Sequence, residues 1–295
     1  MESEELMKCR TRWVTAADGA SVAYYDEGSG PVVVMTNGFA NNTLYWEPLR
    51  ERLRSEYRVI RWDLRGHGRS GPARDLETMT VQGCVDDLRR VLDAAEVEEA
   101  ALLGFSFGCQ IILEAWGHLP ERIRGLVPVL GPFESPFRTL FHPRVGPVFF
   151  SVYRRLGPRL LGPALRLGGL LGRQPPVHGL SQRLGIIGRP TSAEAMRPFY
   201  DHMAQLDPAT WYALGLGAQE HSARRLLSEI GVPTLVVAGG LDRFSPGDVG
   251  EEMATAIPDS ELLFLPEATH TGLFDCADAI GDAVEDFLAR RIYID

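Results

Sequence analysis

Lysine is almost absent from this sequence, and its cysteines form no recognisable motif. Lys8 is the single lysine, to which we attach no function, while Cys9, Cys84, Cys109 and Cys276 lie far apart without a CxxC pair. This spacing predicts neither a disulfide framework nor a zinc site, so we interpret the cysteines as thiols, mostly buried. The formal net charge of -9 would repel phosphate backbones, and we therefore expect no nucleic-acid partner.

The sequence also lacks an apolar run long enough to cross a bilayer. Its most hydrophobic region, residues 145–171, is interrupted by four arginines, and the first ten residues contain three glutamates instead of the basic and apolar segments of a secretory signal. We therefore expect a cytoplasmic protein without stable membrane insertion. No metal or organic cofactor is predicted, and the oligomeric state is left open.

Positive charge is concentrated in the middle of the chain. Residues 136–200 contain ten arginines and one acidic residue, whereas the remainder contains twenty basic and thirty-eight acidic residues. Eleven of the twenty prolines lie between Pro128 and Pro198. We expect these arginines to be ordinary solvated charges, although basic amphipathic segments can also face an anionic lipid surface.

Short apolar runs alternate with amphipathic stretches along most of the chain, which indicates β-α-β units and a parallel sheet. An opening hairpin is predicted at 11–15 and 21–25. The further predicted strands are 32–35, 58–62, 100–103, 123–129, 234–238 and 261–265. The predicted helices are 43–55, 81–95, 108–118, 247–256 and 277–290.

This alternation stops near Gly131 and resumes near Gly231. The intervening stretch is too long and too rich in proline for one more crossover. We therefore predict a core domain formed by residues 1–131 and 229–295, with residues 132–228 inserted as a helical cap over the carboxyl ends of the strands.

The strongest single motif is G-x-S-x-G around Ser106, placed between a predicted strand and a predicted helix. A serine in such a tight turn needs small neighbours two residues away on each side, which Gly104 and Gly108 supply. The turn exposes the hydroxyl, and the following helix directs backbone N–H groups towards developing negative charge. Ser106 is thus the predicted nucleophile, with a purely structural turn as the alternative.

A second oxyanion donor is predicted from another loop. The strand 32–35 leads into Asn37, Gly38 and Phe39, and the backbone N–H of Phe39 together with that of Phe107 would hold a tetrahedral oxyanion. The alternative is an Asn-Gly turn without a catalytic part.

Outside residues 132–228, the chain resembles the α/β-hydrolase fold family. Asn37-Gly38 stands where members usually have a His-Gly pair, and residues 61–70 resemble the family's D-x-R-G-x-G-x-S loop, in which His67 is expected only to pack and form hydrogen bonds. The resemblance implies a mostly parallel, twisted central sheet flanked by helices, with a serine nucleophile of the esterase or lipase type.

The remaining members of a catalytic triad are expected in the order acid and then histidine, each after a late strand. Residues 239–246 resemble the family's G-x-x-D-x-x-x-P loop and contain Asp242, while His270 precedes the last predicted helix. An imidazole can take and return a proton near neutral pH, and an aspartate can fix its tautomer. Glu134, after the strand 123–129, is the alternative acid.

A serine at this turn predicts an acyl-enzyme intermediate and hydrolysis of moderately hydrophobic carboxylic esters, whereas an aspartate there would indicate dehalogenases or epoxide hydrolases. Carbon-carbon bond hydrolysis and cofactor-free perhydrolysis remain alternatives on the same triad. A ligand-binding, receptor-like protein and a scaffold are alternatives of other classes. The expected partner is a small ester, with candidate substrate-binding residues Asn37, Gly38, Phe133, Phe137, Phe141 and Phe244.

Overall fold

A computed structural model describes residues 11–138, 140 and 144–294, and within them eight strands form one sheet in the order β1-β2-β4-β3-β5-β6-β7-β8. β2 pairs antiparallel with β1 and with β4, and all other neighbouring strands are parallel. The strands are β1 (Thr11–Thr15), β2 (Ser21–Glu27), β3 (Val32–Thr36), β4 (Arg58–Trp62), β5 (Ala100–Phe105), β6 (Ile123–Val129), β7 (Thr234–Gly239) and β8 (Ser260–Leu265). The predicted α/β fold with a mostly parallel sheet is confirmed.

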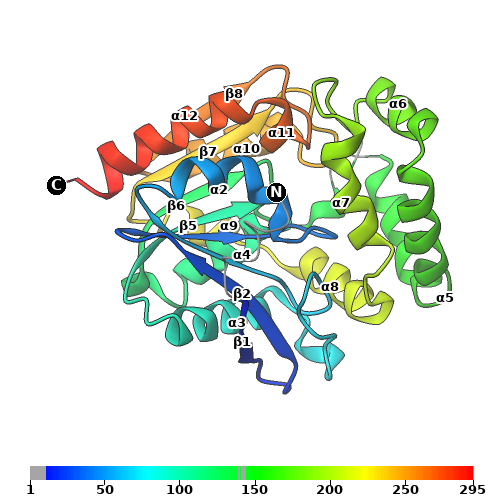
Figure 1. Ribbon diagram of the computed structural model, residues 1–295, viewed down its shortest axis with the longest axis horizontal. Coiled ribbons are helices and arrows are strands. Elements are labelled where there is room, and N and C mark those ends of the chain that lie inside the picture. Colours follow the sequence, from blue (N-terminus) through cyan, green and yellow to red (C-terminus); the bar gives the residue numbers. More distant parts are fainter. Residues whose placement is uncertain (1–10, 139, 141–143, 295) are drawn as a thin grey trace.

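Helices cover both faces of this sheet (Figure 1). Leu102 of β5 packs with the helices of one face and Leu103 with those of the other, because successive side chains of a strand point to opposite sides. The first face carries α3 (Val81–Ala94), α4 (Phe107–Trp116) and α10 (Gly247–Ala256). The second carries α2 (Glu47–Leu53), α11 (Gly272–Asp275) and α12 (Ala277–Phe287).

Short 3-10 turns connect some of these elements, namely η1 (Thr43–Trp46), η2 (Leu76–Thr78), η3 (Pro120–Arg122) and η4 (Pro136–Arg138), and a π-helical turn, η5 (Leu288–Ile292), follows α12. The single helix predicted at 43–55 is therefore wrong in detail, since η1 precedes α2 there. Pro48 explains the break, because it stands in the first turn of α2 and has no N–H to continue the hydrogen bonds of the preceding turn.

Among the described residues, five α-helices lie between β6 and β7, which confirms a helical insertion. They are α5 (Gly146–Gly172), α6 (Pro175–Arg183), α7 (Ala193–Met203), α8 (Pro208–Glu220) and α9 (Arg224–Leu227). α5 to α8 gather at one end of the molecule, at the right of Figure 1, with α5 on its outer side. Phe133 and Leu227, near the ends of this segment, belong to the main hydrophobic core. None of the described helices combines the length and hydrophobicity needed to cross a bilayer.

Candidate active site

Ser106 lies in a strained turn between β5 and α4. Its backbone has a φ of 53° and a ψ of -120°, a conformation that costs a non-glycine residue about 1–3 kcal/mol. The chain packs so tightly here that a Cβ on Gly104 would lie 2.5 Å from the carbonyl oxygen of Gly108. A Cβ on Gly108 would lie 2.4 Å from the carbonyl oxygen of Thr36. The two glycines thus permit the turn that presents the serine.

Three side chains from distant loops form one chain of hydrogen bonds. His270 Nε2 lies 2.9 Å from Ser106 Oγ, and His270 Nδ1 lies 2.8 Å from Asp242 Oδ2. The other oxygen of Asp242 accepts the backbone N–H groups of Phe244 and Ser245 at 2.8 and 2.9 Å, which fixes the buried carboxylate. Since the carboxylate faces Nδ1, the proton belongs on that nitrogen and Nε2 is left to accept from the serine.

The loop that carries His270 is held by a carboxylate that the sequence analysis overlooked. Asp275 accepts the hydroxyl of Thr269 at 2.5 Å and that of Thr271 at 2.9 Å, so it binds the residues on both sides of the histidine. It also accepts the hydroxyl of Thr191, which belongs to the insertion. Asp275 therefore connects the histidine loop to the inserted helices.

Two backbone N–H groups beside Ser106 are suited to an oxyanion. Among the described residues, no acceptor takes the N–H of Phe39 or that of Phe107. The two phenyl rings stack with centroids 4.4 Å apart, and this contact holds the two loops together. A Cβ on Gly38 would lie 2.8 Å from Ser106 Cβ, so this glycine lets the loop approach Ser106 closely.

A cavity of about 460 Å³ opens onto Ser106 and His270. Of the predicted substrate-binding residues, Phe137 and Phe244 line it. Among the described lining residues there is no arginine, lysine, aspartate or glutamate. Moving a charged group into such a cavity is costly without a partner, so the cavity favours an uncharged, apolar ligand.

The structure places the other predicted substrate-binding side chains elsewhere. Asn37 is fully buried and donates to the carbonyl oxygen of Trp62 at 2.8 Å, which turns its amide away from the cavity. Phe133 is buried in the core with the Arg224 guanidinium 4.9 Å from its ring centroid. Neither residue lines the cavity, so both predictions are corrected, while Phe141 lies outside the described residues.

Glu134, the alternative acid, is engaged in a different network. Its carboxylate pairs with Arg224 at 2.8 Å and with Arg138 at 3.0 Å, and it accepts the hydroxyl of Ser222. The hydrogen bonds from Arg224 hold the pKa of Glu134 below its usual value. The imidazole of His270 has Asp242 as its carboxylate partner.

Much of the cavity wall comes from residues that the sequence analysis did not select. Trp211 of α8 and four residues of α7 line the cavity, namely Met196, Phe199, Tyr200 and Met203. The four positions follow the i, i+3, i+4, i+7 spacing of one helical face. This periodicity was a usable signal of an apolar face, although it does not reveal what the face contacts.

Nothing among the described residues suggests a second reactive centre. Cys84, Cys109 and Cys276 are buried free thiols, and burial raises the pKa of Cys109 well above its usual range. The described histidines, cysteines and carboxylates include no cluster that could hold a metal ion. Cys9 lies outside the described residues.

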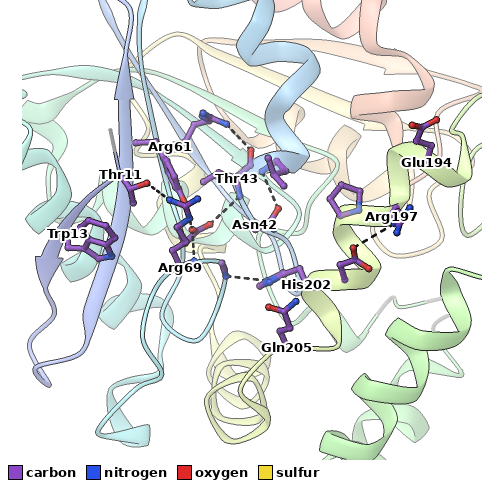
Figure 2. A pocket seen from close by; sticks show the side chains of 16 residues that line it. Thr11, Trp13, Asn42, Thr43, Arg61, Arg69, Glu194, Arg197, His202 and Gln205 are labelled. Atoms are coloured by element: carbon purple, nitrogen blue, oxygen red, sulfur yellow. Dashed lines mark hydrogen bonds and ion pairs between the residues drawn. The ribbon is translucent and has the colours of Figure 1, made fainter. Parts of the chain in front are cut away.

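A second, polar cavity of about 890 Å³ lies between the core and α7 (Figure 2). None of the predicted catalytic residues lines it, and its walls carry both arginines and carboxylates. Figure 2 shows His202 pointing towards the loop after β4, where its Nε2 accepts the N–H of Gly68 at 3.4 Å. The ring of His67 lies 5.8 Å from that of His202, and His67 Nδ1 lies 2.9 Å from the carbonyl oxygen of Arg65. These contacts attach α7 to the core.

The chain is similar to several known hydrolases. The chain is 27% identical over 301 residues to a 2-hydroxy-6-oxononadienedioate/2-hydroxy-6-oxononatrienedioate hydrolase of Cupriavidus pinatubonensis, covering 95% of this chain and 96% of that protein. It is 24% identical to 3-oxoadipate enol-lactonase 1 of Acinetobacter baylyi, covering 87% of this chain and 89% of that protein.

Among solved structures, an esterase from Exiguobacterium antarcticum superimposes with a TM-score of 0.77 at 20% identity, covering 95% of this chain and 99% of that one. This likeness concerns the fold alone. The sequence pattern of the alpha/beta hydrolase fold matches residues 31–276. The chain therefore belongs to the alpha/beta hydrolase fold family.

Proposed function

We propose that this protein hydrolyses uncharged, moderately hydrophobic carboxylic esters through an acyl-enzyme formed on Ser106. The observation that carries the proposal is the hydrogen-bond chain from Ser106 through His270 to Asp242 in the wall of an apolar cavity. A serine hydroxyl is a weak nucleophile unless a base accepts its proton, and the imidazole lies within reach to do so.

In the first step, Ser106 Oγ attacks the carbonyl carbon of the ester while His270 Nε2 takes the hydroxyl proton. The backbone N–H groups of Phe39 and Phe107 bind the resulting oxyanion, and Asp242 stabilises the imidazolium while remaining ionised. The tetrahedral intermediate expels the alcohol, which receives the proton from His270. In the second step, His270 activates water in the same way, and the carboxylic acid leaves Ser106.

The lining of the cavity favours esters and lactones over the carbon-carbon substrates named for the Cupriavidus relative. A dienedioate carries two carboxylates, and no cationic side chain among the described lining residues could pair with them. A lactone is a cyclic ester and undergoes the same two steps. The ring opening implied by the name of the Acinetobacter enol-lactonase therefore fits these two steps, whereas the carboxylate that an adipate-derived lactone retains would find no cationic partner among the described lining residues.

We also propose that the inserted segment, residues 132–228, serves as a cap that determines which esters enter. The insertion contributes the apolar walls from α5, α7 and α8, whereas the core loops contribute the reacting groups. Variation in the cap would then alter substrate preference without disturbing the hydrolytic steps.

The proposal predicts that Ser106→Ala removes nearly all turnover of a p-nitrophenyl ester while the thermal midpoint is retained. Ser106 should also be the residue labelled stoichiometrically by a fluorophosphonate, with mass spectrometry identifying the modified peptide. Labelling without ester turnover would favour a receptor-like protein. Retained turnover in the alanine variant would refute the mechanism.

A matched pair of substrates tests the proposed substrate class. We expect kcat/KM for p-nitrophenyl butyrate to exceed that for p-nitrophenyl hydrogen succinate at least tenfold. The two acyl groups differ chiefly by a terminal carboxylate that the cavity does not neutralise. Equal values for the two esters would contradict an uncharged substrate, and rapid cleavage of a vinylogous diketone with slow ester turnover would favour carbon-carbon hydrolysis.

A further inference from the structure

A continuous row of apolar side chains faces solvent along α5. Val152, Leu160 and Leu167 are 51%, 54% and 55% exposed, although aliphatic residues usually pack inside. The row follows the 3- and 4-residue spacing of one helical face, and we call it the α5 stripe, comprising Phe149, Val152, Leu156, Leu160, Pro163, Leu167 and Leu170. The opposite side of α5 packs on α7 and α8, so the exposed stripe faces away from them. α5 itself lies at the outer side of the molecule (Figure 1).

Arginines accompany the stripe along one edge. Arg155, Arg159 and Arg166 are exposed, and each immediately precedes a leucine of the α5 stripe. Among the described residues, none of these three arginines forms an ion pair with a carboxylate. The helix therefore presents an apolar face bordered by unpaired positive charge.

The α5 stripe reaches the edge of the catalytic cavity. Phe149, at one end of the stripe, lines the cavity and is nevertheless 45% exposed. Its ring centroid lies 5.8 Å from that of Phe137, another lining residue. Leu165 lines the cavity from the buried side of the same helix. A surface that covers the stripe would therefore lie beside the cavity that contains Ser106.

We propose that α5 docks this protein on an anionic lipid surface, with the α5 stripe in contact with the acyl chains and its arginines at the headgroups. The charge distribution supports this occupant, because residues 136–200 carry ten arginines and one acidic residue while the remainder carries twenty basic and thirty-eight acidic residues. A two-fold contact between copies would instead bring two rows of arginines together.

Docking of this kind is interfacial and does not require a spanning helix. No described helix can cross a membrane, and the arginines along α5 would stay at the headgroup level. Docking through α5 would hold the cavity beside the lipid layer. Hydrophobic esters dissolved in that layer would then lie close to the cavity. Lipid binding itself does not depend on ester hydrolysis, so the docking proposal and the proposed enzymatic function can fail separately.

Vesicle sedimentation of the full chain tests the proposal directly. We expect the protein to sediment with vesicles of phosphatidylglycerol and phosphatidylcholine, to bind at least tenfold more weakly to phosphatidylcholine alone, and to be released by high salt. The Ser106→Ala variant should bind equally well. Absence of binding to the anionic vesicles would overturn the proposal whatever the esterase assay shows.

Two sets of substitutions separate the contribution of the α5 stripe to vesicle binding from that of its arginines. The triple variant Val152→Gln, Leu160→Gln and Leu167→Gln should lower the partition coefficient at least tenfold, because it removes apolar side chains that lie outside the cavity lining. The triple variant Arg155→Glu, Arg159→Glu and Arg166→Glu should lower it about a hundredfold.

The matched control for charge is Arg74→Glu, Arg89→Glu and Arg225→Glu, which makes the same change of net charge at exposed positions outside α5. Leu76→Gln, at a leucine of η2 that is 44% exposed, controls for loss of surface hydrophobicity. Both control variants should retain most of the vesicle binding. Every variant should have the same thermal midpoint as the unsubstituted protein. Equal losses in control and stripe variants would overturn the proposal, as would a stable dimer that the glutamine variant converts to a monomer.

Discussion

Replacing Asp275 by asparagine is expected to slow turnover, although this residue touches neither Ser106 nor His270. Its two carboxylate oxygens accept hydroxyls from Thr191, Thr269 and Thr271. An asparagine keeps only one accepting oxygen, so about two hydrogen bonds to a charged group are lost, each contributing about 1.5–3 kcal/mol. Since Asp275 is partly exposed, the loss of unfolding free energy should lie near the lower end of the sum, about 3 kcal/mol.

The effect on catalysis follows from the position of His270 between two of these threonines. Releasing their side chains allows the imidazole to move relative to Ser106, and a displacement of about 1 Å can lower the rate on the order of a hundredfold. We therefore expect a 10- to 100-fold fall in kcat for a p-nitrophenyl ester with a smaller change in KM, because the side chains of α5, α7 and α8 that line the cavity are unaltered. Thermal and urea unfolding would measure the loss of unfolding free energy separately from the loss of turnover.

Asp278→Asn is the matched control, because Asp278 is exposed and lies near Arg52 rather than the histidine loop. A complementary variant, Gly188→Ala, perturbs the same carboxylate from the insertion, since its new Cβ would lie 2.0 Å from the carboxyl group of Asp275. It should also lower kcat. If Asp275→Asn destabilises the protein but leaves kcat intact, Asp275 stabilises the fold and does not position His270.

Other predictions concern the acid, the buried histidines and the nucleophile turn. Asp242→Asn should reduce kcat on the order of 10⁴-fold, whereas Glu134→Gln should leave it within about twofold, as measured on the same ester. Burial lowers the pKa of His67 to about 4, and burial with the neighbouring His67 lowers that of His202 to about 3. An unfolded histidine binds its proton near pH 6.5, so the unfolded chain binds more protons between pH 6.5 and 4 and the free energy of unfolding should fall as the pH falls. Urea titrations at pH 7 and 5 would show this loss, up to about 1.4 kcal/mol per pH unit for each histidine, and His202→Gln should reduce it. Gly104→Ala should abolish turnover and lower the thermal midpoint, because the new methyl group meets the carbonyl of Gly108; normal turnover would contradict the geometry at the turn.

The central strands of the sheet could be predicted from the sequence because they are buried on both faces. β3, β5 and β7 read as uninterrupted apolar runs, and the observed strands differ from the predicted ones by no more than two residues at either end. The ends of the helices could be predicted less accurately than those of the strands. At residues 43–55 the amphipathic pattern continues through Pro48, but the hydrogen bonds do not.

The meeting of the loops that carry Ser106, Asp242 and His270 could be predicted because each loop directly follows a predicted strand, and parallel strands bring their carboxyl ends to one edge of the sheet. The position of a residue after a strand does not, however, predict whether its side chain points into the cavity. Asn37 sits next to the turn at Gly38, yet its amide is held by the carbonyl of Trp62, a contact between residues 25 positions apart. The contact of Asp275 could not be predicted for the same reason, since its partner Thr191 is also distant in the sequence and comes from the insertion.

The core loops hold Ser106 and His270, whereas the inserted helices line much of the cavity, and hydrogen bonds connect the two parts of the chain at several points. The core positions Ser106 through a tight turn that tolerates little change, while side chains of α5 and α7 line the cavity. Asp275 joins the insertion to the histidine loop, and His202 joins it to the loop after β4. We therefore expect a displacement of the inserted helices to reach His270 through Asp275, which would couple the fit of a ligand in the cavity to the alignment of the imidazole with Ser106.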